Sequence, residues 1–343
     1  MKALVLEEYN KLVYKDVADP QAGDGEVLIR VKACGICGSD VHGMDGSTGR
    51  RQPPVIMGHE ASGEIVAVGG GVTRWNVGDR VTFDSTVYPL DDWYTLKGRY
   101  NLSEGRQVVG VSPVDYKRHG AFAEYLAVPQ HILYRIPDSV TFEQAAMVEP
   151  AAVATHAVRL SGIQAGDSAV VIGSGMIGTF IVSMLKASGA TPVIAVDVDE
   201  EKLRMAARYG AGVTVRSGHQ PVADTVRACT KGRGADFGFE AIGIAPTVNT
   251  LIDSLRKGAT AVLVGNVTPE INFPLQKVVT GEIKVQGSCA ISGEYEIVLD
   301  MIAGGALNVD GMISAVAPLS EGAEWFRKLY SREGNLNKVI LVP

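Results

Sequence analysis

The sequence predicts an α/β protein of two domains, a barrel-like antiparallel β domain and a doubly wound parallel-sheet domain. Its 343 residues exceed the size of one typical domain. Up to about residue 150, short β-branched runs alternate with Gly and Pro, whereas strand-like and helical runs alternate further on. Alternating strands and helices are typical of a parallel sheet covered by helices.

The change of pattern near residue 150 predicts a boundary between the two domains. We expect the β-rich domain at residues 1–150 and the second domain from residue 151.

Two strand-like runs support the β-rich interpretation, and two further stretches have other patterns. Runs 26–32 and 63–69 have the composition of strands bounded by breakers. Between 82 and 111 Tyr, Asp, Arg and Asn accumulate without periodicity, which indicates an irregular lobe. The closing segment, from about residue 290, predicts a helical stretch and a final strand at 338–342.

A glycine-rich turn opens the second domain's sheet. The apolar run 168–172 leads into a GxGxxG pattern at 173–178, and residues 179–188 continue with helical spacing. The first glycine makes the turn, the second lets the backbone approach a pyrophosphate, and the third lets helix and strand pack closely. The motif alone is weak evidence in a chain with 40 glycines, but its context predicts a Rossmann domain. The expected cofactor-binding residues are Gly173, Gly175, Met176, Ile177 and Gly178.

An acidic residue follows at the spacing that selects the dinucleotide. The next predicted strand, 192–196, ends in Asp197, nineteen residues after Gly178. A carboxylate there accepts hydrogen bonds from a ribose 2′-OH and repels a 2′-phosphate, so we expect NAD in preference to NADP. Alternatives are a solvated strand-end Asp197 and dual specificity aided by Lys202 and Arg204.

Two later strand ends also finish in glycine. They are Glu240-Ala241-Ile242-Gly243 and Val264-Gly265-Asn266. A ligand lying along the carboxyl edge of a parallel sheet needs such room, which adds Val264 and Asn266 to the expected cofactor site. The alternative is that these glycines only make turns.

A possible metal site draws on three separate segments of the first domain. Cys37 lies in Gly35-Ile36-Cys37-Gly38-Ser39-Asp40-Val41-His42, His59 and Glu60 are adjacent, and Glu149 precedes a proline. Zinc prefers S, N and O donors in a tetrahedron, and a catalytic zinc keeps one position open. We therefore expect a catalytic zinc held by Cys37, His59 and one or both of Glu60 and Glu149.

The alternative is that Cys37 is a buried small hydrophobe and His59-Glu60 a solvated loop. The joint occurrence of these residues with a nucleotide motif favours the metal. Cys34 and Cys37 also form a C-x-x-C pair, but no second pair completes a four-cysteine site, so Cys34 is expected to pack in the core.

Composition narrows the class of partner. A net charge of −6 and a pI of about 5.6 argue against nucleic-acid or membrane-surface binding. The N-terminal residues become acidic too early for a signal peptide, and no apolar run is long enough to span a membrane. Four cysteines fit a reducing compartment. We expect a cytoplasmic protein with a small-molecule partner.

Five motifs together resemble one family. GICGSDVH, GHEASG, the VEP segment at 148–150, GSGMIG and Lys97-Gly98-Arg99-Tyr100-Asn101-Leu102-Ser103 are similar to those of zinc-dependent medium-chain alcohol dehydrogenases, in the polyol branch of sorbitol (L-iditol 2-dehydrogenase) type. The resemblance spans nearly the whole chain. It implies a GroES-like β-barrel catalytic domain made of residues 1–150 and 290–343, and a Rossmann domain at residues 151–289. It also implies reversible NAD-dependent oxidation of a secondary alcohol, such as a polyol, to a ketone.

The resemblance also implies individual roles. Cys37, His59 and a glutamate bind zinc, with Glu60 and Glu149 both matching ligand positions, and Asp40 orients His59. Ser39 and His42 relay the alcohol proton to solvent, so the expected catalytic residues are Ser39, His42, Cys37 and His59. Lys338 matches a basic residue that contacts the cofactor pyrophosphate, and a homodimer or homotetramer is usual.

Two departures from the family pattern narrow this expectation. Where many members carry four cysteines for a structural zinc, the lobe has Pro89, Asp92, Thr95 and Ser103, so we expect one zinc per chain and no structural zinc. Ala290 and Ile291 stand where animal sorbitol enzymes carry an arginine and a tyrosine, which argues against sorbitol itself as the substrate.

Two other functions stay open. A sugar-phosphate or amino-alcohol dehydrogenase, of galactitol-1-phosphate or threonine dehydrogenase type, could use the same scaffold, with Arg50, Arg51 and Arg118 holding a phosphate. A non-catalytic NAD-binding or redox-sensing protein is the other alternative, and the intact ligand and relay set argues against it.

Overall fold

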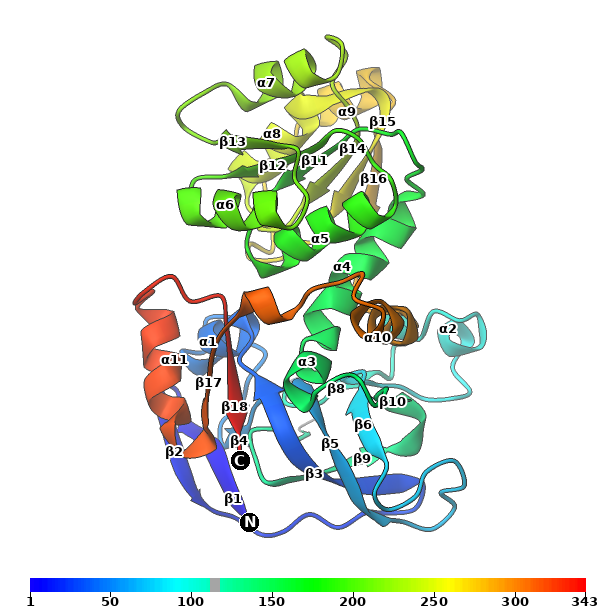
Figure 1. Cartoon of the computed structure of the whole chain (residues 1–343), viewed down its shortest axis with the longest axis vertical. Helices are drawn as coiled ribbons and strands as arrows, with labels where there is room; N and C mark the ends of the chain where they lie inside the picture. Colours follow the sequence, from blue (N-terminus) through cyan, green and yellow to red (C-terminus); the bar gives the residue numbers. More distant parts are fainter. Residues whose placement is uncertain (112–117) are drawn as a thin grey trace. The chain divides into compact units, whose positions relative to one another are not determined.

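A computed structural model describes residues 1–111 and 118–343 of the chain (Figure 1). The chain forms two compact units, one of Met1–Glu149 with Tyr295–Pro343 and one of Pro150–Glu294. No helix among the described residues has both the length and the apolar character needed to cross a bilayer.

The first unit is built on two main sheets. A three-stranded sheet has the order β2-β1-β4, and a larger one runs β10-β6-β5-β3-β18-β17, with β9 also paired to β3. All pairings are antiparallel except that of β17 with β18. The strands are β1 (Lys2–Glu8), β2 (Lys11–Asp16), β3 (Glu26–Gly35), β4 (Val55–Ile56), β5 (Glu60–Val68), β6 (Arg80–Phe83), β9 (Tyr125–Pro129), β10 (Leu133–Arg135), β17 (Ile313–Pro318) and β18 (Lys338–Val342).

The strands expected at 26–32, 63–69 and 338–342 are therefore confirmed as β3, β5 and β18. The helices of this unit are short and connect the strands. They are α1 (Gly38–Met44), α2 (Trp93–Leu96), α3 (Phe142–Ala146), α10 (Tyr295–Ala303) and α11 (Gly322–Tyr330), and α4 (Val148–Ser161) begins here and continues into the second unit.

The expected lobe contains little regular structure. It holds α2 and a two-stranded sheet of β7 (Thr86–Val87) and β8 (Gln107–Val108). Asp92 begins α2, because its Oδ2 accepts hydrogen bonds from the amides of Tyr94 and Thr95 at 2.9 and 3.2 Å.

The second unit is a six-stranded parallel sheet of order β13-β12-β11-β14-β15-β16. Helices α5 and α6 lie on one face and α7, α8 and α9 on the other (Figure 1). The strand order reverses at β11, which is where such sheets bind ligands at their carboxyl edge. Its elements are β11 (Ala169–Ile172), α5 (Met176–Ala187), β12 (Val193–Asp197), α6 (Glu200–Arg208), β13 (Val213–Arg216), α7 (Val222–Cys229), β14 (Ala235–Glu240), α8 (Ala245–Ser254), β15 (Leu255–Leu263), α9 (Leu275–Thr280) and β16 (Lys284–Gly287).

Candidate active site

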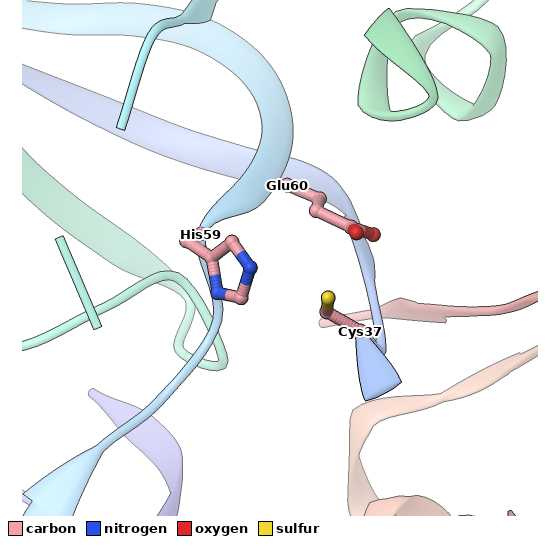
Figure 2. Close-up of side chains that lie close together, drawn as sticks. All are labelled: Cys37, His59 and Glu60. Atoms are coloured by element: carbon pink, nitrogen blue, oxygen red, sulfur yellow. The ribbon is translucent and has the colours of Figure 1, made fainter. Parts of the chain in front are cut away.

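Cys37, His59 and Glu60 converge at one end of the barrel (Figure 2). Cys37 follows β3 and is the residue that caps α1, while His59 and Glu60 stand at the start of β5. The β3–β5 register pairs Gly35 with Glu60, so the two segments meet there. One ligand atom from each residue lies within 4.8 Å of the other two.

This donor set fits a catalytic zinc site. A thiolate, an imidazole and a carboxylate are ligands that zinc accepts, and three protein ligands leave a position for substrate. His59 is 6% and Glu60 1% exposed, so neither lies in a solvated loop. The alternative that treated His59 and Glu60 as a solvated pair is therefore wrong.

Glu149, the other expected carboxylate, lies outside that group of three. Burial raises the pKa of its carboxyl above the ordinary range, and the charge of Glu60 adds to this while those of His59 and Lys338 oppose it. Glu149 is thus close enough to be influenced by the cluster. Its part in binding metal stays a prediction.

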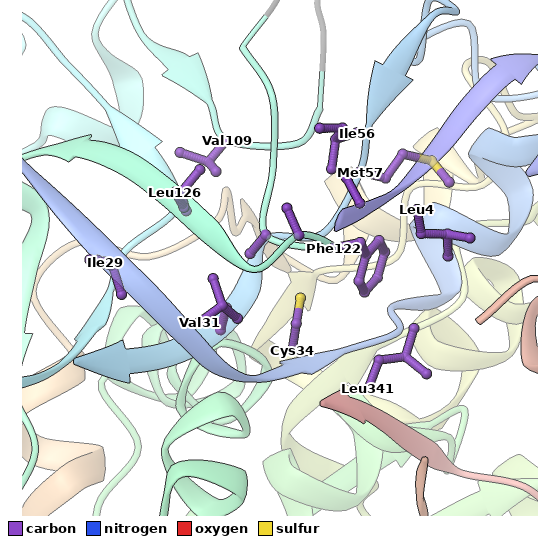
Figure 3. Close-up of a cluster of buried hydrophobic side chains, with 14 of the residues drawn as sticks. Leu4, Ile29, Val31, Cys34, Ile56, Met57, Val109, Phe122, Leu126 and Leu341 are labelled. Atoms are coloured by element: carbon purple, nitrogen blue, oxygen red, sulfur yellow. The ribbon is translucent and has the colours of Figure 1, made fainter. Parts of the chain in front are cut away.

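Cys34 packs in the hydrophobic core, as expected (Figure 3). It is 1% exposed, and burial raises the pKa of its thiol well above the ordinary value. Gly58 provides the space, because a Cβ at that position would lie 2.9 Å from the Cys34 sulfur.

A buried carboxylate, Asp40, stands behind the cluster. Its Oδ2 accepts a hydrogen bond from the Cys37 amide at 3.3 Å, and its Oδ1 lies 3.4 Å from Nδ1 of His59. Since Nδ1 faces Asp40, Nε2 is the atom of His59 left for a metal. Burial lowers the pKa of His59, but Asp40 and Cys37 outweigh it and raise the pKa well above its ordinary value.

Arg51 completes this group, and nothing in the sequence singled it out for the role. It is 1% exposed, and its Nη2 donates to Asp40 Oδ1 at 2.6 Å. Burial raises the pKa of Asp40, but His59 and Arg51 outweigh it and hold the pKa well below the usual range. Arg51 is thus committed to Asp40, and the expectation that it could hold a substrate phosphate is wrong.

The two expected relay residues lie on α1. Ser39 is half-buried, and its Oγ accepts a hydrogen bond from Nη2 of Arg51 at 3.2 Å. His42 is exposed, with its ring centroid 6.5 Å from that of Tyr330. A relay to solvent needs an inner and an outer member, and their burial follows that order. The relay itself stays a prediction.

Lys338 is the first residue of β18 and is 3% exposed. Its ammonium forms an ion pair with Glu60 and donates to the carbonyl of Ile36 at 3.1 Å. Burial lowers the pKa of Lys338, but Glu60 and Cys37 outweigh it and raise the pKa above its usual value. The expected contact with a cofactor pyrophosphate stays a prediction beside this observed partner.

Two glycines of the turn in the second unit, Gly178 and Gly175, have different surroundings. A Cβ at Gly178 would lie 1.7 Å from the carbonyl oxygen of Gly173, so helix α5 packs directly on the turn. A Cβ at Gly175, directly before α5, would meet no atom of the described residues within 4 Å apart from its chain neighbours. The third glycine is therefore required by the protein, and the second leaves room at the amino end of the helix. Met176 and Ile177 form the first turn of α5.

Asp197 ends β12 and is 8% exposed. Its Oδ2 accepts from the amide of Ser174 at 2.8 Å and its Oδ1 from the amide of Asp199 at 3.0 Å. The carboxylate thus links the glycine turn to the next loop, at the strand end where a ribose is expected. It is not a freely solvated strand-end residue.

The glycines that follow β14 and β15 pack against each other. A Cβ on Gly265 would lie 2.2 Å from the amide nitrogen of Gly243, so the two strand ends touch each other. Buried Glu240 fixes this contact by accepting hydrogen bonds from the amides of Ile242 and Gly243 at 3.0 and 2.9 Å. Backbone packing between the two strand ends is sufficient to require glycine at both positions. The roles of Val264 and Asn266 toward a cofactor stay predictions.

The structure also describes Ala290 and Ile291, the two residues that depart from the pattern of the sorbitol enzymes. Ile291 is 1% exposed, and Ala290 has a φ of 51°. Ile291 therefore contributes to a core.

Two family models and a known enzyme match this chain. The model of the alcohol dehydrogenase GroES-like domain matches residues 23–138, and that of the zinc-binding dehydrogenase domain matches residues 177–304. The chain is 33% identical over 341 residues to D-xylulose reductase A of Aspergillus oryzae, covering 97% of this chain and 94% of the relative.

Solved structures agree as well. Galactitol-1-phosphate dehydrogenase from Escherichia coli is 26% identical with a TM-score of 0.92 and covers 100% of both chains. A zinc-binding dehydrogenase from Sinorhizobium meliloti 1021 bound to NADP is 31% identical with a TM-score of 0.90, covering 100% of this chain and 99% of the other. The expected fold, a GroES-like barrel with a Rossmann domain, is confirmed.

Proposed function

The chain belongs to the zinc-dependent medium-chain alcohol dehydrogenase superfamily, and from that premise we propose that it oxidises a secondary hydroxyl of a polyol to a ketone, reversibly, with NAD as hydride acceptor. The observation that carries the proposal is the convergence of Cys37, His59 and Glu60. A molecule that only binds nucleotide has no need of such a donor set.

Zinc, when bound, acts as a Lewis acid that polarises the substrate oxygen and lowers the pKa of the hydroxyl. Cys37, His59 and Glu60 would hold it, with Glu149 as a further candidate ligand, and Asp40 would keep the His59 ring oriented. Ser39 would accept the hydroxyl proton and pass its own proton to His42, which is exposed and would release a proton to solvent. The hydride chemistry belongs to the nicotinamide, and the protein supplies its position.

NAD is the proposed cofactor because of Asp197. Its carboxylate stands at the strand end where the ribose of a dinucleotide is recognised, and a 2′-phosphate would meet a negative charge there. The NADP-bound relative makes the competing cofactor a necessary part of the test.

A polyol without phosphate is the proposed substrate class. D-xylulose reductase is the relative that supports it, whereas the galactitol-1-phosphate enzyme supports the phosphorylated alternative. Of the three arginines that could hold a phosphate, Arg51 is buried on Asp40 and Arg118 lies 3.5 Å from Glu26. Only Arg50 is left exposed.

The decisive experiment measures NADH and NADPH formation from polyols, secondary alcohols, amino alcohols and polyol phosphates, each with and without a zinc chelator. We expect chelator-sensitive NADH formation from an unphosphorylated polyol, and none from the matched Cys37→Ser variant. A phosphorylated polyol oxidised far better than its parent would replace the substrate class. Zinc-loaded protein that is inactive on the whole panel would reject the proposal.

We further propose a cytoplasmic homo-oligomer. Four free cysteines and an acidic pI support a reducing compartment, and oligomers are usual in the superfamily. Light scattering of the purified protein tests the assembly, and a mass equal to one chain would contradict it.

A further inference from the structure

A charged arginine is buried directly behind the candidate metal site. Arg51 is 1% and its partner Asp40 0% exposed. One nitrogen of Arg51, Nη2, lies 2.6 Å from Asp40 Oδ1 and 3.2 Å from Ser39 Oγ. Because α1 carries both acceptors, the guanidinium fixes two neighbouring side chains of the same helical turn.

The surrounding fold makes room for this side chain. A Cβ at Gly43 would lie 2.8 Å from Cδ and 3.0 Å from Nε of Arg51, so the arginine occupies the place where any other residue would have its side chain. Tyr9 contacts the backbone of the same residue, because its hydroxyl donates to the Arg51 carbonyl at 3.0 Å. Gly43 thus leaves space for the Arg51 side chain, and Tyr9 binds the Arg51 backbone.

Stability alone does not account for the pair. Burying two charges is costly, and well-packed apolar residues of similar volume are often at least as stabilising. Nε of Arg51 has no hydrogen-bond partner among the described residues, so the guanidinium is not fully satisfied. The arrangement is better explained by what its acceptors do.

Asp40 and Ser39 are those acceptors, and both serve the proposed chemistry. Asp40 Oδ1, the atom bound by Arg51, is also the atom facing His59 Nδ1 at 3.4 Å. Asp40 Oδ2 holds the amide of Cys37. A single carboxylate therefore supports two of the expected zinc ligands, and Arg51 determines where that carboxylate lies.

We propose that Arg51 is a positioning residue, which holds Asp40 and Ser39 in place so that His59 and Cys37 are preorganised for zinc and the Ser39 hydroxyl is oriented for proton transfer. This inference rests on the proposed function. Partners behind metal ligands typically change metal affinity or activity by about 10- to 100-fold when removed.

The test compares zinc release and metal spectra of four variants. Arg51→Met keeps the stem and removes the charge, Arg51→Lys keeps the charge, and Gly43→Ala displaces the intact arginine. Arg256→Met is the control, because Arg256 also forms an ion pair with an aspartate, Asp236, but belongs to the other unit. Each variant is measured for zinc transfer to a chromogenic chelator, for the visible spectrum after cobalt substitution, and for its melting temperature.

We expect zinc release to be about 10- to 100-fold faster in Arg51→Met, with altered cobalt bands. Arg51→Lys should recover at least half of this loss on a logarithmic scale, and Arg256→Met should release zinc at the wild-type rate despite a lower melting temperature. If Arg51→Met does not fold, Gly43→Ala decides by the same readouts.

The inference would be overturned if Arg51→Met released zinc at the wild-type rate with wild-type cobalt bands. It would also be overturned if Arg51→Met and Arg256→Met had the same melting temperature and showed the same increase in the rate of zinc release. These readouts use no turnover. Wild-type protein that holds zinc but oxidises no alcohol therefore rejects the proposed function while the role of Arg51 is still decided, and wild-type protein that holds no zinc rejects both.

Discussion

Replacing Gly175 with alanine is expected to impair cofactor binding without weakening the fold, whereas the same change at Gly178 should weaken the fold itself. The two glycines stand three residues apart in one turn but meet different surroundings. Apart from its chain neighbours, a methyl group on Gly175 meets no atom within 4 Å in the part of the chain that the structure describes. One on Gly178 would lie 1.7 Å from the Gly173 carbonyl oxygen.

The magnitudes follow from these contacts. At Gly178 turn and helix must separate by more than an ångström, which we expect to cost about 3 kcal/mol. At Gly175 φ is −67°, which alanine adopts freely, so stability should change by less than about 1 kcal/mol. If the second glycine admits the pyrophosphate, its methyl group should weaken NADH binding about 10- to 100-fold, or by about 1.4–2.8 kcal/mol.

Urea unfolding measures the first quantity and a fluorescence titration with NADH the second. Gly212→Ala is the matched control, because its added methyl group would come no closer than 3.9 Å to Val193 and lies away from the turn. We expect this variant to equal the wild type in both assays. NADH affinity at the wild-type level in Gly175→Ala would refute the placement of the pyrophosphate.

Three further changes test other parts of the molecule. Cys37→Ser should abolish zinc retention and turnover while NADH affinity stays within about 2-fold, since the nucleotide turn lies in the other unit. Metal analysis and rate measurements on this variant provide the test, and turnover at the wild-type rate would show that Cys37 does not hold a catalytic zinc. Asp197→Ala should narrow the preference for NAD over NADP by about 10-fold or more, and an unchanged ratio of kcat/KM would mean that another carboxylate selects the cofactor. Burial raises the pKa of Asp236, but hydrogen bonds from Ser168 and Arg256 outweigh it and lower the pKa to about 2, so this group stabilises the fold above its unfolded pKa and the contribution is lost as pH falls toward 2. Asp236→Asn should therefore lose about 1 kcal/mol, after allowance for solvent screening, at pH 7 but little near pH 2, and unfolding curves with equal differences at both pH values would contradict this.

The nucleotide fold could be predicted because its signal is local. A buried strand, a glycine turn and an amphipathic helix follow one another at 168–188, and each carries its own pattern. The metal donors were harder to place, since Cys37 and Glu60 meet through the pairing of β3 with β5 and no spacing encodes that register. The residue types suggested zinc, and the fold shows that Glu60 lies together with Cys37 and His59.

The sequence did not reveal the contacts that several other residues make in the folded chain. Arg51 follows another arginine in a loop and reads as surface charge, and its burial depends on space left by Gly43. Lys338 looks like the polar start of a strand, yet the β3–β18 pairing places it beside Glu60. The paired glycines 243 and 265 suggested a ligand because contact between two loop backbones cannot be seen in one dimension.

The ion pair between Glu60 and Lys338 has a consequence for biosynthesis. Its members are separated by 278 residues, and the whole of the second unit is encoded between them. At ordinary rates of translation, the ribosome therefore takes about 15–55 s to reach the lysine after the glutamate has been made. During that interval the thiol, the imidazole and the carboxylate have already been synthesised, but β18 has not yet joined the barrel. The parallel sheet of the second unit is therefore translated in full before Lys338 can pair with Glu60.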